Sequence, residues 1–186
     1  MKQRWVIAAV LVAALFIMVG VVFGAADYFL KIDDVKGESA DAKHKGEIDI
    51  LSWTWGVSQP GTGSRSAGGA VSAARVQFQD FRFTMRVNSA SPIFFQACAT
   101  GRLFKQAVFT GRKAGKAQQE FYRIIFTDIV FTSYQTEGTG TGDQIPIDRF
   151  SFNFGKVAIE YSPQKTDGSL GAAIQAKWDV RGNTKF

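Results

Sequence analysis

The residues of this chain that could do chemistry are few, and the best candidates are one thiol and one imidazole. Cys98 is the only cysteine and His44 the only histidine, and a thiol beside an imidazole is a pair that nucleophilic catalysis uses. Cys98, however, lies in an apolar segment, where a cysteine usually packs as a small buried hydrophobe. Nothing in the sequence brings His44 to it. The paired acids Asp33 and Asp34 lie in a polar turn, where we expect them to be solvated.

The sequence also has few residues that could bind a metal or a cofactor. A single cysteine excludes an intramolecular disulfide framework and a thiolate zinc site, and a single histidine argues against a histidine-rich metal site. The glycine-rich stretches lack the lysine of a phosphate-binding loop and do not join a strand to a helix. The sequence therefore predicts a protein that is not an enzyme and that uses no cofactor and no metal.

Composition favours a folded domain that does not bind nucleic acid. The 186 residues are 46% hydrophobic and 13% aromatic, enough for a packed core. The net charge of +6 and the pI near 9.5 are basic, but the basic residues are scattered, whereas a phosphate-binding surface gathers them.

Charge divides the chain into two parts, residues 1–26 and 27–186. No acidic residue precedes Asp27, and Trp5–Phe23 is a run of apolar residues and glycine that follows Lys2 and Arg4. As a helix, the uncharged stretch to residue 26 would be roughly 33 Å long, enough to cross a bilayer. We therefore expect residues 1–26 to be a hydrophobic leader that contacts a membrane, followed by a single domain.

The leader has three interpretations at this point. Gly24 and Ala26 are small residues suitably placed for signal-peptide cleavage before Asp27, while the length of the apolar run favours a retained membrane anchor. The third is a misassigned start codon, with Met18 as the alternative start.

Most of the chain after residue 27 alternates apolar and polar residues with period two, the pattern of half-buried strands. One helix interrupts them at Ile93–Thr100, with Ser91 as its cap, Pro92 in its first turn and Gly101 at its end. Loops rich in Gly, Ser and Thr are expected at Pro60–Ala74 and Thr136–Gly142. The predicted strands are Tyr28–Ile32, Ile48–Val57, Val76–Val87, Leu103–Arg112, Glu120–Tyr134, Phe150–Tyr161 and Ala172–Arg181.

Two of these strands change phase part of the way along. In Val76–Val87 the slip falls near Gln79–Asp80 and predicts a β-bulge, and in Phe150–Tyr161 it falls at Gly155. Such slips bend a sheet, and bent sheets close into barrels. The sequence thus predicts an all-β fold, a barrel or sandwich with one short helix.

Several segments, in this order, resemble the haemolysin-coregulated protein (Hcp) family, the tube proteins of type VI secretion systems. The resemblance covers essentially all of residues 27–186, and the run E-I-D-x-L-S-W-x-W-G is its most specific part. The matching segments are DYFLKIDDVKGES (27–39), HKGEIDILSWTWGVSQ (44–59), FQACATG (95–101), RKAG (112–115), TDIVFTSYQTEG (127–138), SFNFGKVAIEYSPQ (151–164) and DGSLGAA (167–173).

The resemblance implies a compact β-barrel of two sheets with one flanking helix. It also implies six-membered rings that stack into a tube inside a contractile sheath, behind a spike, and carry effector proteins in the lumen. Alternation places Trp53 and Trp55 on one face, where we expect them to pack in the core, and Thr54 on the other. By resemblance, Thr54 faces the lumen and contacts cargo.

Two functions remain open on the sequence. The first is a subunit of the secretion tube, assembled in the cytoplasm and secreted through the type VI system, with the leader removed or misassigned. The second is an exported or inner-membrane-tethered ring that binds a protein partner outside the sheath, because family members generally begin near Asp27 and lack a leader.

Overall fold

The computed structural model describes residues 26–60, 75–113, 118–140 and 145–186. The predicted leader helix and most of the loop at Pro60–Ala74 lie outside these residues. Within the described ranges, no helix is long and apolar enough to cross a membrane.

The described residues form eleven strands and one helix. In chain order they are β1 (Ala26–Ile32), β2 (Ile48–Ile50), β3 (Ser52–Thr54), β4 (Val57–Ser58), β5 (Gln77–Phe78), β6 (Phe81–Arg86), α2 (Ser91–Thr100), β7 (Leu103–Lys113), β8 (Glu120–Glu137), β9 (Ile147–Asn153), β10 (Lys156–Tyr161) and β11 (Ile174–Asp179).

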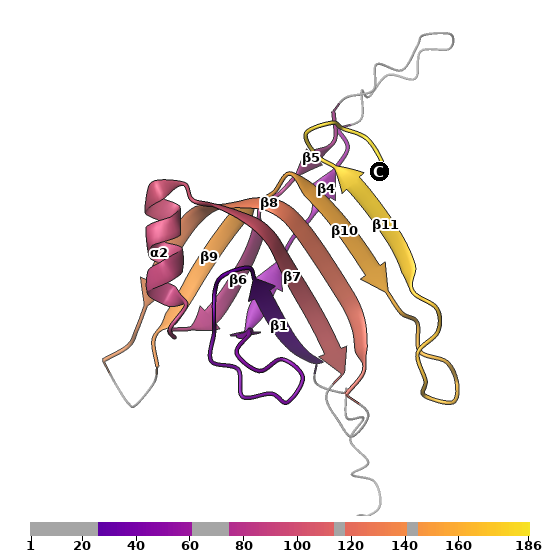
Figure 1. The fold of residues 1–186 in the computed structure, drawn as a ribbon, viewed down its shortest axis with the longest axis horizontal. Coiled ribbons are helices and arrows are strands. Elements are labelled where there is room, and N and C mark those ends of the chain that lie inside the picture. The colour runs from indigo at the N-terminus through magenta and orange to yellow at the C-terminus, as the bar shows by residue number, and fades with distance from the viewer. Residues whose placement is uncertain (1–25, 61–74, 114–117, 141–144) are drawn as a thin grey trace, which may run out of the picture.

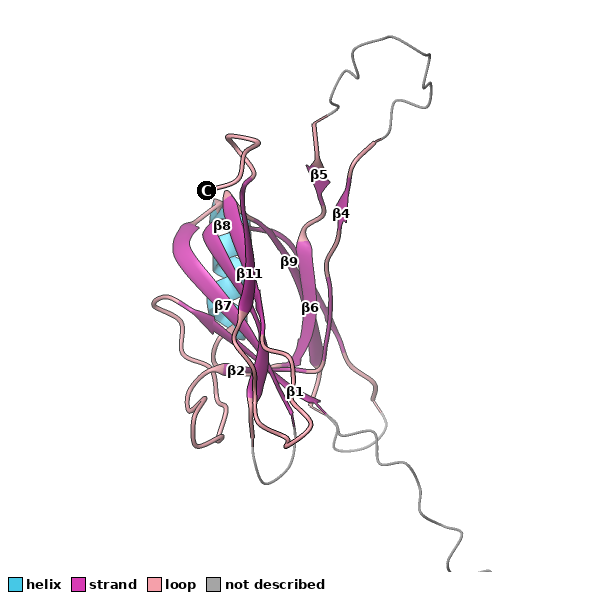
Figure 2. Ribbon diagram, turned by 90° about the vertical axis from the view of Figure 1, so that its right-hand side faces the viewer, coloured by secondary structure: helices cyan, strands magenta, loops and turns pink. Residues whose placement is uncertain are grey.

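Nine strands form one antiparallel sheet, and the segment that contains β2 and β3 closes it into a barrel. The main path runs β2-β1-β7-β8-β9-β6-β3, and β10 and β11 extend it beside β8. Its two ends are consecutive in the chain: β2 pairs with β1, β3 pairs with β6, and the N–H of Leu51 between them donates to the carbonyl of Thr84. A second, two-stranded sheet, β4-β5, extends away from the barrel beyond β6 (Figure 2). The expected barrel of two sheets with one helix is confirmed.

The predicted phase slips are sites where the chain passes from one pairing to another. Gln79 and Asp80 separate β5 from β6, which lie in different sheets, so the bulge predicted there within a single strand is wrong. Gly155 separates β9 from β10, and both pair with β8 at different points along its length. A Cβ at Gly155 would lie 3.2 Å from the Cβ of Asp128, so any other residue at this turn would push against β8.

The helix covers one side of the barrel, opposite β11, and packs against β8 (Figure 1). Its start differs from the prediction. Ser91 is the first helical residue and Ala90 the cap position, which has no side-chain cap hydrogen bond. The Ser91 hydroxyl instead accepts from the N–H of Asn88. Pro92 lies in the first turn, and Gly101 ends the helix at φ 66°, both as predicted.

The barrel is filled mainly by phenylalanine. Rings from β6, β7, β8, β9 and α2 meet edge-on or tilted at centroid separations near 5 Å, as aromatic quadrupoles prefer. These rings come from strands far apart in the sequence, so the core forms only when the barrel closes. Its largest fully buried members include Phe81, Phe83, Phe94, Phe109, Phe126, Phe150 and Phe152.

A buried arginine fastens the connector between β1 and β2 to the barrel. Arg112 of β7 is only 3% exposed, and one of its nitrogens lies 2.7 Å from Asp41 and 3.0 Å from Asp27. Its guanidinium also lies over the ring of Phe29, which stacks at 4.1 Å on His44. His44 in turn bonds Glu47 through Nδ1. This Arg112 cluster holds the connector against β1 and β7.

The cluster predicts a loss of stability in acid. The Arg112 side chain, aided by the backbone N–H groups of Lys43 and His44, holds the pKa of Asp41 well below its ordinary value of 3.8. A carboxyl whose pKa is lower in the folded state stabilises the fold above its unfolded-state pKa and loses that contribution as the pH falls. The free energy of unfolding in urea should therefore drop between about pH 5 and pH 2.

The variant Asp41→Asn should be less stable than the native chain at pH 7 and should show a shallower acid loss. Some loss will remain, because hydrogen bonds from Ser169 and from Gly182 also lower the pKa of Asp167 and of Asp179. Asp34→Asn, at an exposed turn position, is the control and should retain the native slope. Equal slopes in native and Asp41→Asn protein would contradict this role for the cluster.

Candidate functional site

Four neighbouring strands, β3, β6, β9 and β8, carry a row of polar residues on the outer face of the barrel. Thr54 lies opposite Arg82 in the β3-β6 ladder, Arg82 lies opposite Ser151 in the next ladder, and Ser151 lies opposite Ser133. Residues opposite each other in a sheet point to the same side. These four side chains therefore form one continuous row across the four strands.

A second row runs beside the first, two residues along each strand. It contains Ser52, Thr84, Arg149 and Gln135, again joined by direct cross-strand pairing. Together with Asp80 and Thr132 the two rows line a shallow hollow of about 680 Å³. We call this surface the polar face.

A bulge in β8 concentrates hydroxyl groups at one end of the polar face. The register of β8 with β9 shifts between Phe131 and Ser133, which leaves Thr132 and Ser133 both exposed. The hydroxyl of Ser151 lies 2.8 Å from that of Thr132 and 2.6 Å from that of Ser133. These contacts keep Ser151 almost fully covered although it belongs to the outer face.

The tryptophans beside Thr54 pack inward, as predicted. Trp53 and Trp55 are partly buried against the core, and Trp53 lies 4.8 Å from the ring of Phe109. Thr54 is exposed and lines the polar face. The alternation of side chains is thus confirmed, whereas the lumen position of Thr54 remains a prediction.

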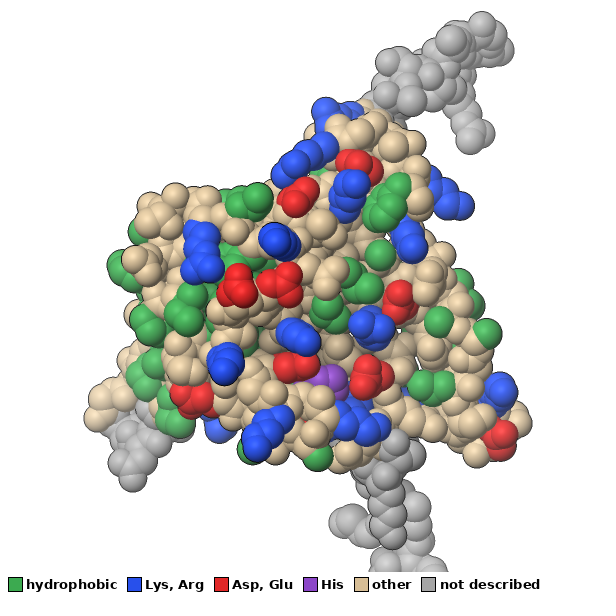
Figure 3. All heavy atoms as spheres, viewed as in Figure 1, with side chains coloured by type: hydrophobic (Ala, Val, Ile, Leu, Met, Phe, Trp, Pro, Cys, Tyr) green, Lys and Arg blue, Asp and Glu red, His purple; other side chains and the backbone are tan. Residues whose placement is uncertain are grey.

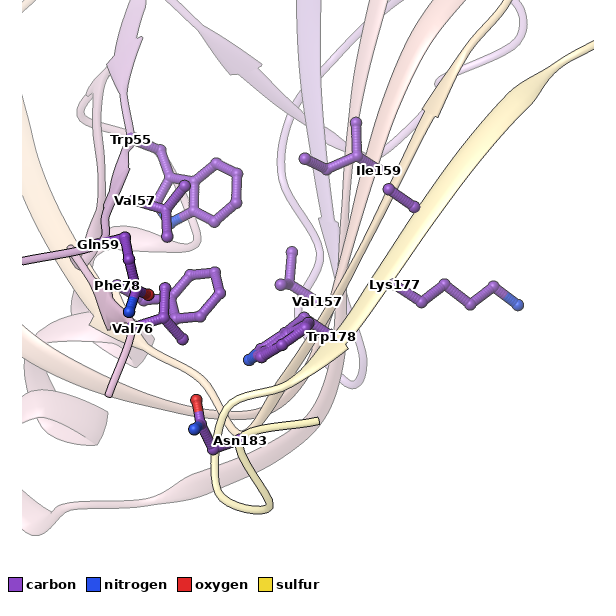
Figure 4. Close-up of a pocket in the computed structure, with 11 residues that line it drawn as sticks. Trp55, Val57, Gln59, Val76, Phe78, Val157, Ile159, Lys177, Trp178 and Asn183 are labelled. Atoms are coloured by element: carbon purple, nitrogen blue, oxygen red, sulfur yellow. The ribbon is translucent and has the colours of Figure 1, made fainter. Parts of the chain in front are cut away.

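An apolar cleft of about 440 Å³ opens where β4 and β5 face β10 and β11. Figure 4 shows side chains of both layers pointing into it, with Lys177 directed away. Val57 is 53% exposed there. The cleft is lined mainly by Trp55, Val57, Val76, Phe78, Val157, Ile159, Ala176 and Trp178.

The two tryptophans of the apolar cleft bring unused hydrogen-bond donors to it. Within the described part of the chain, the indole N–H groups of Trp55 and Trp178 are buried and have no acceptor. A buried donor without a partner costs about 1–3 kcal/mol.

The thiol and the imidazole occupy separate environments. Cys98 is partly buried on α2 against the core rather than fully buried, and His44 is buried in the Arg112 cluster. Of the two acids expected to be solvated, Asp34 is exposed and Asp33 is partly exposed. In the described ranges, no three His, Cys, Asp or Glu residues are grouped so as to hold a metal ion.

Surface charge shows no concentration of one sign on the face drawn in Figure 3, where Lys and Arg alternate with Asp and Glu.

Sequence reasoning missed two features of the site, Arg82 on the polar face and the apolar cleft. The alternation of Phe81, Phe83 and Met85 placed Arg82 outward, but only strand order could place it beside Thr54.

Comparison with known proteins places the chain among type VI secretion proteins. The family model described as "Type VI secretion system effector, Hcp" matches residues 29–161. Protein hcp1 of Pseudomonas aeruginosa is 40% identical over 163 residues, which are 87% of this chain and 99% of that protein.

Solved structures agree with this result. A type six secretion system protein superposes with a TM-score of 0.81 at 28% identity, covering 87% of this chain and all of the other. Hcp1 from Salmonella typhimurium superposes with a TM-score of 0.70 at 31% identity, covering 87% of this chain and 99% of that one. The fold and its relatives thus define a type VI secretion system protein. Within that class, the chain belongs to the Hcp family, as its sequence motifs predicted.

The orientation of β3 can be tested directly, because its neighbouring residues Trp53 and Thr54 point to opposite sides of the sheet. Trp53→Ala should lower the free energy of unfolding by about 3 kcal/mol, because it leaves a cavity among aromatic rings. Thr54→Ala should change it by less than about 0.5 kcal/mol, because the side chain is exposed. Urea unfolding followed by circular dichroism measures both. Similar losses for the two variants would show that the strand is not oriented as described.

Proposed function

We propose that this protein is the structural subunit of a type VI secretion tube, in which six copies form a ring and rings stack. The observation that supports this most directly is the apolar cleft of an Hcp-family barrel, which the described residues of the protomer leave uncovered. Soluble monomers rarely leave such an apolar surface open, so a partner is expected to cover it. A second copy of the chain is the partner that a ring requires.

The outer edge of β11 also supports self-assembly. Among the described strands β11 pairs only with β10, and on its other edge Asp179 alone is paired, with Thr184. The rest of that edge presents backbone groups that could pair with a neighbour. A ring in which each copy contacts the next through two different surfaces is a heterologous assembly that closes.

The polar face is proposed to line the lumen, with Thr54 contacting cargo. A lumen that carries proteins and lets them go needs a wet, hydroxyl-rich wall rather than an apolar one, because weak polar contacts exchange readily with water. In this proposal the protein's role is structural and not catalytic, and its partners are effector cargo within, a sheath around the tube and a spike at its tip.

A charge placed in the apolar cleft tests whether ring assembly depends on this surface. Val57→Asp places a charge in the apolar cleft at a position exposed in the protomer, so the barrel should fold while assembly is lost. Size-exclusion chromatography with light scattering and negative-stain images should show native rings of six times the mass of the assembled subunit, which is at most 20.4 kDa. The variant should run as a monomer.

The matched control is Ser58→Asp, the next residue of β4, which is exposed and does not line the cleft. It should assemble as the native chain does. A native chain that is strictly monomeric would contradict the ring proposal. Rings that persist in Val57→Asp would show that the cleft is not the contact surface.

We further propose that the assembled subunit lacks all or most of the leader, residues 1–26, and that residues 27–186 are the tube domain. The run Trp5–Phe23 has no charge to oppose membrane insertion, and a tethered subunit could not join a tube that leaves the cell. N-terminal sequencing of assembled protein from the cytosol should therefore find a start at or after Met18, whereas a start at Asp27 in periplasmic protein would contradict the tube. An intact Met1 in the membrane fraction would instead favour a tethered ring that binds a partner outside the sheath.

A further inference from the structure

The polar face contains one guanidinium, that of Arg82, that has no ionic partner among the described residues. Arg82 is exposed at the centre of the four-strand row, directly opposite Thr54 on one side and Ser151 on the other. Among the described residues, no carboxylate lies within ion-pair distance of it. An arginine side chain has five N–H donors and no acceptor, so it is suited to bind a carboxylate in two-point contact.

Several of its polar neighbours already have partners within the protomer. Arg149 pairs with Glu137 at 2.6 Å, and the hydroxyls of Ser52 and Thr84 lie 2.5 Å apart. These groups have less capacity left for a ligand than Arg82 has.

The carboxylate of Asp80, at the end of the hollow, is also engaged. Its two oxygens accept hydrogen bonds from Thr132 at 2.7 Å and from Asn153 at 2.9 Å. Among the described residues, Asp80 forms no ion pair with Arg82. The free donors of the row are concentrated at Arg82, with the hydroxyl of Thr54 beside it.

A second unpaired arginine extends this preference along β6. Arg86 is exposed and lies on the same face as Arg82, because it is four positions further along the same strand. At ~3.3 Å per residue they are roughly 13 Å apart. Within the described part of the chain Arg86 also has no ion-pair partner. The face thus offers two separate cations rather than one continuous basic strip.

We propose that the polar face selects acidic protein cargo, with Arg82 as the residue that binds cargo carboxylates and Thr54 as its hydrogen-bonding neighbour. This inference rests on the proposed lumen position of the face, which would repeat Arg82 six times around each ring. A folded protein presents separate carboxylates that can meet separate arginines. A nucleic acid fits less well, because its phosphates are continuous whereas the unpaired arginines of the face are separate.

Binding to assembled rings of the native protein tests this proposal. The probes are three fluorescent polymers of equal length: a 20-residue Glu/Ser peptide, a Lys/Ser peptide and a 20-nucleotide single-stranded DNA. Fluorescence anisotropy should show that the Glu/Ser peptide binds most tightly and that salt weakens its binding. Arg82→Gln should weaken that binding about tenfold, because each exposed ion pair contributes little but several act together in one ring.

Two more variants separate charge selection from general damage. Thr54→Glu places a carboxylate directly opposite Arg82, so it should pair with Arg82 and weaken binding of the acidic peptide by at least as much. Lys177→Gln removes the same charge from β11 at a side chain directed away from the apolar cleft (Figure 4), and it should bind as the native chain does.

Negative-stain images of each sample show whether the tube function or only the selection of acidic cargo fails. If the native chain forms no rings, the proposed tube function fails. If rings form but the acidic peptide binds equally well to native and Arg82→Gln rings, or binds to neither, the selection of acidic cargo is overturned. Tighter, Arg82-dependent binding of the DNA would overturn the choice of protein as the ligand.

Discussion

The constraint on which the rest of this structure depends is the double pairing of one extended segment, residues 48–54. Its first half pairs with β1 and its second half with β6, so the two ends of the main sheet are joined through consecutive residues. Closure removes two sheet edges and sets an inside and an outside for every strand. The inward position of Trp53 and the outward position of Thr54 follow from it, as does the polar row that crosses four strands.

Closure also explains how a chain of this size supports two unlike surfaces. The polar face lies outside strands whose other side is filled with phenylalanine, and that packing fixes the backbone beneath the hydroxyls. The apolar cleft lies where the barrel is not continuous, between the β4-β5 pair and β10-β11. At the start of the domain, the Arg112 cluster holds the long connector in place, so that β2 reaches β1 in the correct register.

Local alternation predicted most strands and the facing of the tryptophans, because burial on one side of a strand gives the sequence a period of two. The helix was predicted from its cap, proline and glycine signals. Alternation could not say whether the slip at Gln79–Asp80 was a bulge or a transfer between sheets, since both shift the phase by one residue. It also could not show that Arg82 lies opposite Thr54, or that Arg112 meets Asp27 and Asp41, because these contacts join distant parts of the chain. Ser91 was misplaced by one position because a serine before a proline suits both a cap and a first turn.

The length of β8 has a mechanical consequence. Its first part pairs with β10 and its last part with β9, while β7 runs along its other side. The strand therefore joins the wall that bears the polar face to the wall that bears the cleft through one uninterrupted backbone. In a tube pushed along its axis, stress applied to one wall would pass to the other through ladders in which many hydrogen bonds resist sliding together. A subunit built in this way would deform as one stiff body, and its rings would yield at the contacts between copies before the barrels themselves opened.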